Sequence, residues 1–260
     1  MSHGKQDSRA YLKKKAAFAK VLTIYGRKPV AEALEQTDIS PFRLHLADSN
    51  KPAGIINDII KQASHKGAEV LYHSRAALSR ISKNSKQDQG VALDIQCQGF
   101  TSLDEFTNNL PSQYDLIAVD AVTNPQNLGM IIRSACASPC TAVLLPEHGC
   151  ARLDALVIKA SAGTLFKANI IRCDDLAAAI TQLRERGAQA FALAGGGNLE
   201  LCNLPLSGQN IYVVGNETHG ISAAVMSRCQ HKVRIAMARG VESLNVGVAA
   251  SLVAFHRLYR

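Results

Sequence analysis

The chain has 260 residues, and five of its polar side chains lie in segments that are richer in polar and glycine residues than a connection between elements requires. They lie in three segments that each follow an apolar run, and they are Asn127, Arg133, Glu217, Ser243 and Asn245. A guanidinium stays protonated at neutral pH, so Arg133 is suited to binding a phosphate or stabilising a developing negative charge, and is a poor base. Plainer explanations stay open for each segment alone, namely a helix cap with a surface arginine, or a turn with an exposed acid.

The apolar runs ahead of these segments predict buried strands at residues 116–119, 211–214 and 233–235. In an open parallel sheet, ligands bind in the loops beyond the carboxyl ends of the strands. We therefore expect the three segments to border one binding region. Asn127 is expected to cap a helix over residues 127–137, and Ser243 to cap a helix over residues 243–258.

Strand and helix patterns alternate along two stretches of the chain, which indicates α/β structure with a parallel sheet covered on both faces in the second stretch. In the first stretch we expect strands at 21–25, 42–47, 69–72 and 90–95 and helices at 29–35, 55–65 and 75–81. In the second we expect further strands at 141–145, 170–171 and 189–193 and further helices at 153–160 and 176–186. The predicted organisation is a basic flexible tail (1–20), a small α/β domain (21–98), a linker without regular structure (99–113) and a larger α/β domain (114–260).

The net charge of +8 is concentrated at the front of the chain. Residues 1–100 hold 16 Lys and Arg against 9 Asp and Glu, whereas residues 101–260 hold 13 against 12. Within residues 1–20, six basic side chains face one acidic side chain. A basic front attached to a neutral back suggests a part that holds a polyanion and a separate part with another task. A solvated arm without a specific role is an equally good interpretation of the tail.

Composition argues against several classes of protein. No run of about 18 uncharged apolar residues is present, so we expect no membrane span, and the N-terminus lacks the apolar core of a secretory signal. Seven cysteines without a CxxC pair indicate reduced thiols in a cytoplasmic protein and no metal site. Residues 195–198 (GGGN) are interpreted as a connecting loop, because they match no phosphate-binding motif. The nearly uniform apolar composition of residues 243–258 predicts a helix that is buried all round or packed against a partner.

Taken together, the three segments resemble the signature motifs of the SPOUT methyltransferases, in particular the TrmH-like branch that methylates ribose 2′-hydroxyls of tRNA and rRNA. The first family motif, N-x-G-x-x-x-R-S/T-A, matches residues 127–135, and the second, G-x-E-x-x-G, matches residues 215–220. The third, which ends in S-L-N-V, matches residues 235–246. Residues 25–30 and 89–92 look like the small RNA-binding substrate domain that often precedes this catalytic domain.

The resemblance implies a fold, a cofactor and partners. The fold would be a parallel-sheet α/β domain with a deep trefoil knot, and the cofactor S-adenosyl-L-methionine, cradled by the backbone of Gly215, Ile235 and Leu244. The partners would be RNA, either rRNA or tRNA, and a second copy of the chain in a homodimer, with no metal and no membrane. Arg133 would be the key catalytic residue. Asn127, Glu217, Ser243 and Asn245 would orient Arg133, the ribose and the loops. The motifs do not designate the group that accepts the proton.

Three hypotheses for the function follow. The first is an S-adenosylmethionine-dependent RNA ribose-2′-O-methyltransferase acting on structured RNA. The second is a non-catalytic RNA-binding or ribosome-assembly factor that retains the SPOUT fold, which is favoured by Ala236 in place of the family's usual proline. The third is a base methyltransferase of the same superfamily, against which the intact S-L-N-V segment argues.

Overall fold

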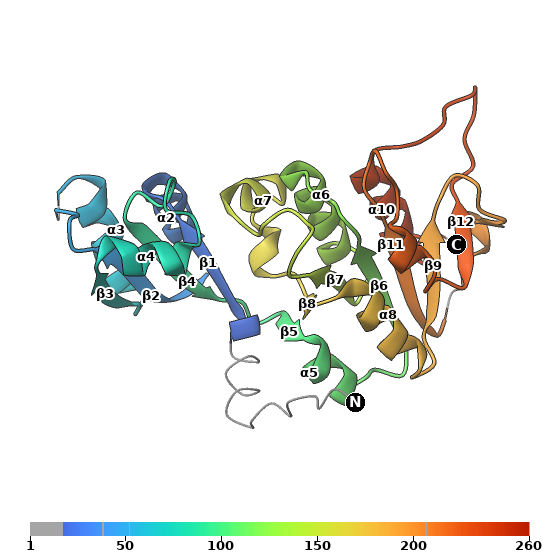
Figure 1. Cartoon of the computed structure of the whole chain (residues 1–260), viewed down its shortest axis with the longest axis horizontal. Coiled ribbons are helices and arrows are strands. Elements are labelled where there is room, and N and C mark those ends of the chain that lie inside the picture. Colours follow the sequence, from blue (N-terminus) through green and yellow to red (C-terminus); the bar gives the residue numbers. More distant parts are fainter. Residues whose placement is uncertain (1–17, 38, 52, 206, 260) are drawn as a thin grey trace, which may run out of the picture.

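Two β-sheets lie one after the other along the long axis of the molecule (Figure 1). The structure is a computed structural model that describes residues 18–37, 39–51, 53–205 and 207–259. The basic tail predicted at residues 1–20 therefore lies, up to residue 17, outside the described residues. The strands of the first sheet all precede residue 97, and those of the second all follow residue 99.

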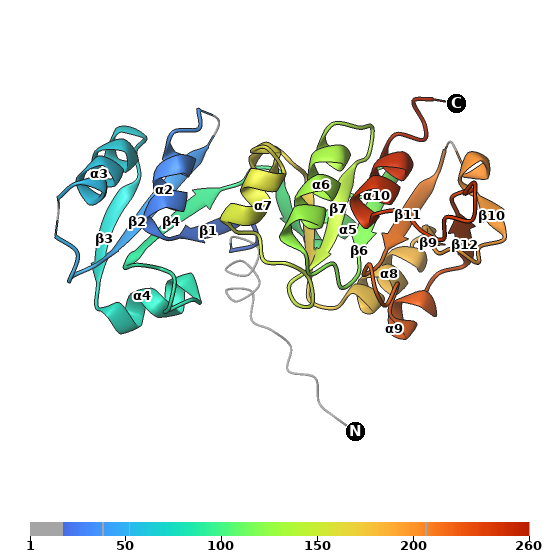
Figure 2. The same ribbon diagram turned by 90° about the horizontal axis from the view of Figure 1, so that it is seen from above.

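The first sheet has four strands in the order β1-β4-β2-β3, with β2 and β3 parallel and the other two pairs antiparallel. Its strands are β1 (Val21–Tyr25), β2 (Ser40–Ala47), β3 (Glu69–His73) and β4 (Val91–Gln96). Its helices are α2 (Arg27–Leu34), α3 (Ile55–His65) and α4 (Arg75–Ser82). Figure 2 shows α2 and α3 on one face of this sheet and α4 on the other. The predicted strands and helices of this part are confirmed to within two residues at each end.

The second sheet has eight strands in the order β10-β12-β9-β11-β6-β7-β8-β5, and every neighbouring pair is parallel. The strands are β5 (Phe100–Ser102), β6 (Tyr114–Val119), β7 (Ala142–Pro146), β8 (Ile170–Cys173), β9 (Gln189–Leu193), β10 (Leu199–Glu200), β11 (Gln209–Val214) and β12 (His231–Arg234). All six residues of β6 are buried, as the apolar run predicts for a strand covered on both faces. The trefoil knot that the resemblance implies stays a prediction.

Helices cover both faces of the second sheet (Figure 2). They are α5 (Leu103–Asn108), α6 (Pro125–Cys136), α7 (Ala155–Ala160), α8 (Leu176–Arg184), α9 (Ala223–Met226) and α10 (Val246–Ala254), with short 3-10 turns η1 (Thr164–Phe166) and η2 (Leu201–Asn203). On one face α6 and α10 pack over the side chains of Ile117, Val119 and Val143. On the other face α8 packs over Leu116 and Leu144. Alternate residues of β6 and β7 thus enter two separate cores.

The predicted linker at residues 99–113 is wrong, because this stretch holds β5 and α5. Phe100 is fully buried, and β5 pairs with β8, which lies about 70 residues further along the chain. The Ser102 hydroxyl caps α5 by accepting a hydrogen bond from the Glu105 amide at 3.1 Å. A three-residue edge strand has too short a pattern to recognise locally, and only its distant partner makes it a strand.

The C-terminal helix is shorter than predicted, and it begins at Val246 instead of Ser243. The side chain of Asn245 caps it by accepting hydrogen bonds from the Gly247 and Val248 amides at 2.9 and 3.3 Å. Ser243 therefore lies in the preceding loop and is not the cap. Both residues are good cap formers, and tertiary contacts of Asn245, described below, decide between them.

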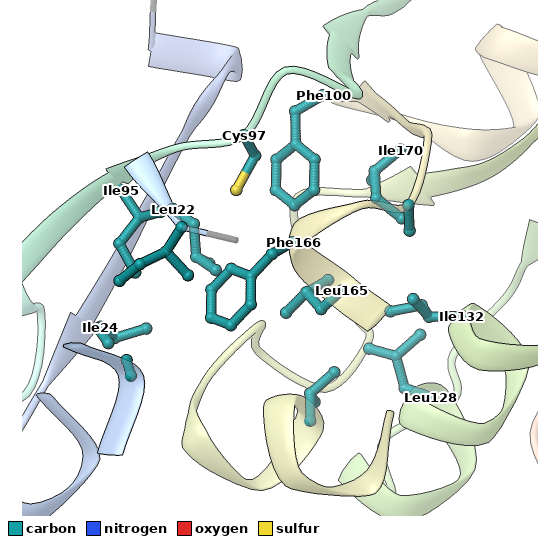
Figure 3. Close-up of a cluster of buried hydrophobic side chains, with 14 of the residues drawn as sticks. Leu22, Ile24, Ile95, Cys97, Phe100, Leu128, Ile132, Leu165, Phe166 and Ile170 are labelled. Atoms are coloured by element: carbon teal, nitrogen blue, oxygen red, sulfur yellow. The ribbon is translucent and has the colours of Figure 1, made fainter. Parts of the chain in front are cut away.

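One apolar cluster connects the two sheets (Figure 3). Leu22 and Ile24 of β1 and Ile95 of β4 contribute from the first sheet, and Phe166 of η1 contributes from the second part. Through η1 the cluster continues to Ile132 on the buried side of α6. Its members are almost all fully buried. The two sheets therefore share a core, and the small sheet is packed against the region that leads to α6.

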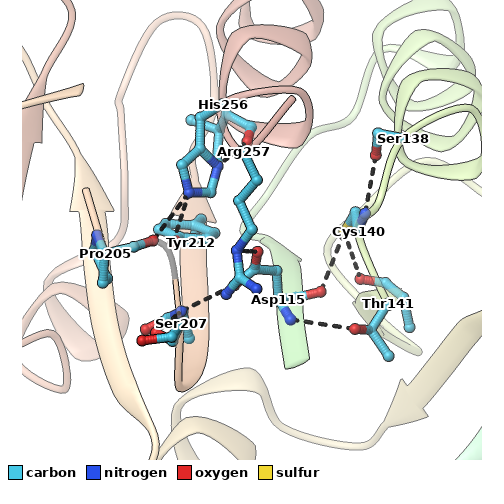
Figure 4. A network of polar contacts seen from close by, with 12 residues as sticks. Asp115, Ser138, Cys140, Thr141, Pro205, Ser207, Tyr212, His256 and Arg257 are labelled. Carbon is cyan, nitrogen blue, oxygen red and sulfur yellow. Dashed lines mark hydrogen bonds and ion pairs between the residues drawn. The ribbon is translucent and has the colours of Figure 1, made fainter. Parts of the chain in front are cut away.

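A buried ion pair holds the end of the chain against the amino edge of the second sheet (Figure 4). Arg257, beyond α10, donates from Nη2 to Oδ1 of Asp115 in β6 at 2.6 Å, across 142 residues of sequence. Asn210 of β11 donates to the same oxygen at 2.9 Å. Burial raises the pKa of the Asp115 carboxyl, while the hydrogen bond from Asn210 and the charge of Arg257 act in the opposite direction. The pair holds the residues after α10 against the start of β6.

We predict that Asp115→Ala lowers the free energy of unfolding by about 3–5 kcal/mol, because it leaves the largely buried Arg257 guanidinium without its counter-charge. Urea denaturation followed by circular dichroism measures this change. Glu185→Ala removes an exposed carboxylate at the end of α8 and serves as the control, with a change within about 0.5 kcal/mol. Equal stability of the two variants would contradict the prediction.

The structure also bears on the cysteines and on membrane-spanning helices. All seven cysteines are free thiols, and burial raises the pKa of Cys97 and of Cys173 to about 12, so that both stay protonated at neutral pH. Among the described residues, no helix has the length and apolar character needed to cross a bilayer.

Candidate functional site

The sheet offers one point where the chain diverges to opposite sides, and the first two polar segments meet there. Strands β6 and β11 are neighbours, and Val119 and Val214 lie opposite each other at their carboxyl ends. From β6 the chain continues to β7 and β8 on one side, whereas β9 and β12 lie on the other side of β11. Loops that diverge in this way leave a crevice at which α/β proteins bind ligands.

The side chain of Asn127 joins the three segments. Its Nδ2 group donates to Oε1 of Glu217 in the loop after β11, and its Oδ1 accepts from Nδ2 of Asn245 at 2.8 Å. Asn127 is 6% exposed, whereas Glu217 and Asn245 are exposed at the surface of the site. One buried amide thus makes two directional bonds to loops that are 90 and 118 residues away in sequence. We call Asn127, Glu217 and Asn245 the amide–carboxylate group.

We expected Asn127 to cap α6, and this is wrong. The cap is Asn124, whose side chain accepts from the Gln126 amide at 2.9 Å, and Pro125 occupies the first helical position. Asn127 lies one turn into the helix, where its side chain is free to point across to the neighbouring loops. The dipeptide Asn124-Pro125 is the sequence signal for this earlier start.

Asn216, which was not among the predicted site residues, connects the loop after β11 to the loop after β6 by a hydrogen bond. Asn216 donates from Nδ2 to the Ala121 carbonyl at 2.9 Å, and its Oδ1 accepts from the amides of Thr218 and His219. The loop closes tightly, since a Cβ on Gly215 would lie 2.4 Å from the Gly220 carbonyl carbon. Glycine is therefore required at position 215, and Glu217 is held on a short, internally bonded turn.

A cavity of about 430 Å³ is lined in part by the segment that directly precedes Asn245 in the sequence. Its wall includes the predicted residues Ile235, Ser243 and Leu244. It also includes Leu193 at the end of β9, Gly195 in the loop that follows, and Ala249 of α10. Gly195 belongs to residues 195–198, which form a loop as predicted. The cavity lies within the 300–1,000 Å³ typical of small-molecule sites. Gly215 does not line it.

Arg133 lies apart from the amide–carboxylate group. It is exposed near the end of α6, and its guanidinium makes no hydrogen bond or ion pair within the described part of the chain. Within the described residues, Arg133 makes no hydrogen bond to Asn127, Glu217, Ser243 or Asn245. The reason is helical geometry, because a separation of six residues turns Arg133 about 120° away from Asn127 around the helix axis.

The thiol of Cys150 lies at the carboxyl end of β6, where its Sγ contacts the Val119 carbonyl at 3.4 Å. Burial raises its pKa, so it is protonated at neutral pH and is no nucleophile. Within the described ranges, no group of three or more His, Cys, Asp and Glu side chains is placed to hold a metal ion. What the site does offer is a cavity, a rigid set of polar loops and an unpaired, solvent-facing guanidinium.

Comparison with known sequences identifies the family of the chain. The sequence profile of the SpoU rRNA Methylase family matches residues 114–255, and a profile described as RNA 2'-O ribose methyltransferase substrate binding matches residues 23–98. The chain belongs to the SpoU rRNA methylase family. It is 31% identical over 235 residues to an "Uncharacterized tRNA/rRNA methyltransferase" of Mycolicibacterium paratuberculosis, covering 89% of this chain and 75% of that protein. The Mycobacterium avium protein of the same name is 30% identical, with the same coverage.

Solved structures share the fold of this SpoU-family chain. The SpoU methyltransferase AviRb of Streptomyces viridochromogenes, in complex with AdoMet, aligns with a TM-score of 0.60 and 18% identity over 96% of this chain and 93% of that chain. An AdoMet-bound rRNA methyltransferase of Sinorhizobium meliloti aligns with a TM-score of 0.60 and 21% identity over 96% and 90% of the two chains. The SpoU/TrmH architecture predicted from the motifs is confirmed.

We predict that Asn127→Asp destabilises the SpoU domain by about 2–3 kcal/mol at pH 7.5, because it sets a second carboxylate against Glu217 and removes a donor. Repulsion raises the pKa of this carboxylate pair in the folded state. The loss is therefore present at high pH and shrinks as the pH falls and the pair takes up a proton.

Urea denaturation at pH 7.5 and 5.5 measures this effect. Gln126→Glu adds a carboxylate to the same turn of α6 on its exposed side, and we expect little change from it. If Asn127→Asp lowers the free energy of unfolding by the same amount at both pH values, repulsion by Glu217 is not the cause.

Proposed function

We propose that the protein is an S-adenosylmethionine-dependent methyltransferase that modifies ribose 2′-hydroxyls of structured RNA, either rRNA or tRNA. The observation that carries the proposal is the meeting of the three motifs, in which Asn127 bonds to Glu217 and Asn245 next to a cavity lined by Leu244. Membership of the SpoU family supports the reaction class, and the match of the small domain to a 2'-O ribose substrate-binding profile supports the ribose as acceptor.

The cavity fits the cofactor in chemical character. Ile235, Leu193 and Leu244 offer apolar surface for a nucleoside base, while Ser243 and backbone groups of the surrounding loops offer hydrogen bonds. Two solved neighbours of the same fold carry AdoMet. When bound, S-adenosylmethionine supplies an electrophilic methyl group. The protein holds it with the loop that contains Ile235 and the segment that contains Leu244, with Gly215 keeping the turn behind Glu217 closed.

The residues of the chain then have separate tasks. The amide–carboxylate group holds the three loops in one arrangement, so that the acceptor hydroxyl is presented in line and at short range. Arg133 faces solvent on α6, six residues after Asn127, and is suited to binding the phosphate beside the acceptor ribose and stabilising negative charge on the 2′-oxygen. A guanidinium stays protonated at neutral pH, which excludes Arg133 as the proton acceptor.

The small domain supplies the hold on RNA. Residues 18–97 carry the basic side chains of α4 and the loop after it, Arg75, Arg80, Lys83 and Lys86, all in the exposed or half-buried class. The basic tail ahead of residue 21 adds further positive charge. Contacts of this kind with phosphates make binding fall steeply with salt and carry little sequence information, so the shape of the RNA selects the target.

The test is to incubate the protein with methyl-labelled S-adenosylmethionine and total tRNA or rRNA, followed by digestion of the RNA to nucleosides. We expect the label in 2′-O-methylnucleosides. Label on a nucleobase would favour the base methyltransferase. Absence of label together with RNA binding, and no binding of S-adenosylmethionine in calorimetry, would favour the non-catalytic RNA-binding factor.

We predict that Arg133→Ala lowers the rate of RNA methylation by about 10²–10³-fold, as the loss of a group that stabilises charge in the transition state does. Binding of S-adenosylmethionine, measured by calorimetry, is expected to change less than twofold, because Arg133 does not line the cavity. Arg186→Ala is the matched control, since Arg186 is exposed and donates only to the Gln182 carbonyl of its own helix end. Equal rates for the two variants would rule out the role given to Arg133.

We further propose that the protein is a homodimer that pairs through α10. Val248 and Leu252, one turn apart on this helix, are 39% and 41% exposed, and Tyr259 beyond its end is 82% exposed. They border an apolar groove of about 500 Å³ that also includes Leu201 and Phe255. Continuous apolar surface of this kind favours burial against a second copy, as the composition of residues 243–258 suggested.

We predict that Leu252→Glu converts the dimer to a monomer, because it places a charge in the centre of the apolar contact. Sedimentation equilibrium or light scattering measures the mass. Leu156→Glu is the control, since Leu156 is 61% exposed on α7, away from this groove, and its change is expected to leave the mass unaltered. A wild-type protein that is monomeric at tens of micromolar would contradict the dimer.

A further inference from the structure

Arg152, in the loop after β7, bridges the second part of the protein to the small domain. Its Nη1 and Nη2 groups donate to the carbonyls of Lys83 and Ser82, both at 3.2 Å. These carbonyls lie at the C-terminal end of α4, where the helix leaves acceptors unsatisfied and carries partial negative charge. An arginine is therefore well matched to this end, because its planar fork reaches two acceptors at once.

The same guanidinium lies over an aromatic ring of the small sheet. Its central carbon is 5.6 Å from the ring centroid of Tyr25, at the end of β1. Tyr25 is in turn held by Asn84, whose Nδ2 donates to the phenol oxygen at 3.0 Å. Arg152 thus contacts both the helix α4 and the strand β1, and the two contacts together define a direction as well as a distance.

On its other side, Arg152 adjoins residues that are bonded to the loop after β6. The Ala151 amide donates to the Val122 carbonyl at 2.8 Å. The carbonyl of the preceding residue, Ala121, accepts from Asn216 in the loop of Glu217. Ala121 has a φ of 54°, a left-handed conformation that a residue with a side chain adopts only when its surroundings hold it there. The loop then runs directly into α6.

The apolar cluster between the sheets (Figure 3) provides contact area but little orientation, since hydrophobic burial is non-directional. The bonds of Arg152 are the directional contacts between α4 and the loop after β7. Arg152 directly follows Ala151, whose amide donates to Val122 in the loop that leads to Asn127 and Arg133. A change in the tilt of the small domain would therefore move a residue that adjoins that loop.

We infer that Arg152 is a positioning residue that sets the orientation of the small domain relative to the loop before α6. RNA held by the small domain then presents its reacting nucleotide to Arg133 in a fixed register. Arg152 touches neither the cavity nor the amide–carboxylate group, so it acts through the segment from Ala151 to Val122. The inference rests on the proposed function, since it concerns how that same site receives RNA.

The kinetic test compares Arg152→Ala and Arg152→Lys with the Arg186→Ala control on full-length structured RNA. We expect kcat to fall about tenfold for Arg152→Ala, because a small misplacement of the reacting atoms is costly, while KM for RNA and for S-adenosylmethionine changes less than twofold. Arg152→Lys keeps the charge but not the fork, and we expect an intermediate loss of about threefold. Tyr25→Leu is expected to lower kcat similarly, and the double variant to be no worse than Arg152→Ala alone.

A second readout does not depend on activity. Amide hydrogen exchange at Ala151, whose amide donates to Val122, is expected to be at least about threefold faster in Arg152→Ala than in the wild type and in Arg186→Ala. An unchanged rate of exchange, or an unchanged kcat in an active enzyme, overturns the inference. If the wild type methylates no RNA but Arg152→Ala still loosens this amide, the proposed function fails and the positioning by Arg152 stands.

Discussion

The site depends on one buried amide. A primary amide is both donor and acceptor, so Asn127 can bind a carboxylate and a second amide at the same time. It uses both capacities, toward Glu217 and Asn245, and so connects loops that come from three different strands. Neither a hydrophobic side chain nor a charged one of similar size would satisfy both neighbours. The cavity beside it has a defined shape because these loops have one arrangement.

Beyond that amide, structural and chemical tasks are assigned to different residues. The polar groups of the amide–carboxylate group are occupied with one another, whereas Arg133 faces solvent without a partner in the described part of the chain. An unpaired guanidinium at the surface retains its full capacity to bind a phosphate or an anionic oxygen. The arrangement is what a reaction on a large polyanionic substrate requires, since the substrate arrives from solvent and completes the site.

The two parts of the molecule also divide their work by charge and by packing. Among the described residues, the small domain has an excess of basic over acidic side chains, whereas the larger domain is balanced in charge and contains the cavity. One apolar core joins the two. Hydrophobic contact of this kind stabilises association without choosing an angle. Directional contacts such as those of Arg152 with the end of α4 are needed to choose one.

Much of this could be predicted from the sequence, because local physics decides it. Apolar alternation and turn residues place most of the strands and helices, α3 to the residue, and the three motifs indicate the family. Strand β5 could not be predicted, because three residues become a strand only when β8 lies beside them. The caps were also undecided locally, since Asn124 and Asn127, or Ser243 and Asn245, are equally able to begin a helix.

What the sequence alone determined is the set of elements, the chemistry of the candidate side chains and the class of reaction. What only the tertiary structure decided is which of those side chains meet. Asn127, Glu217 and Asn245 contact one another and not Arg133, and Gly195 and Arg152 enter the account although no motif contains them. The physical reason is that side-chain contacts between distant segments depend on strand order and helix phase. These are properties of the whole packed chain and are not contained in any one segment.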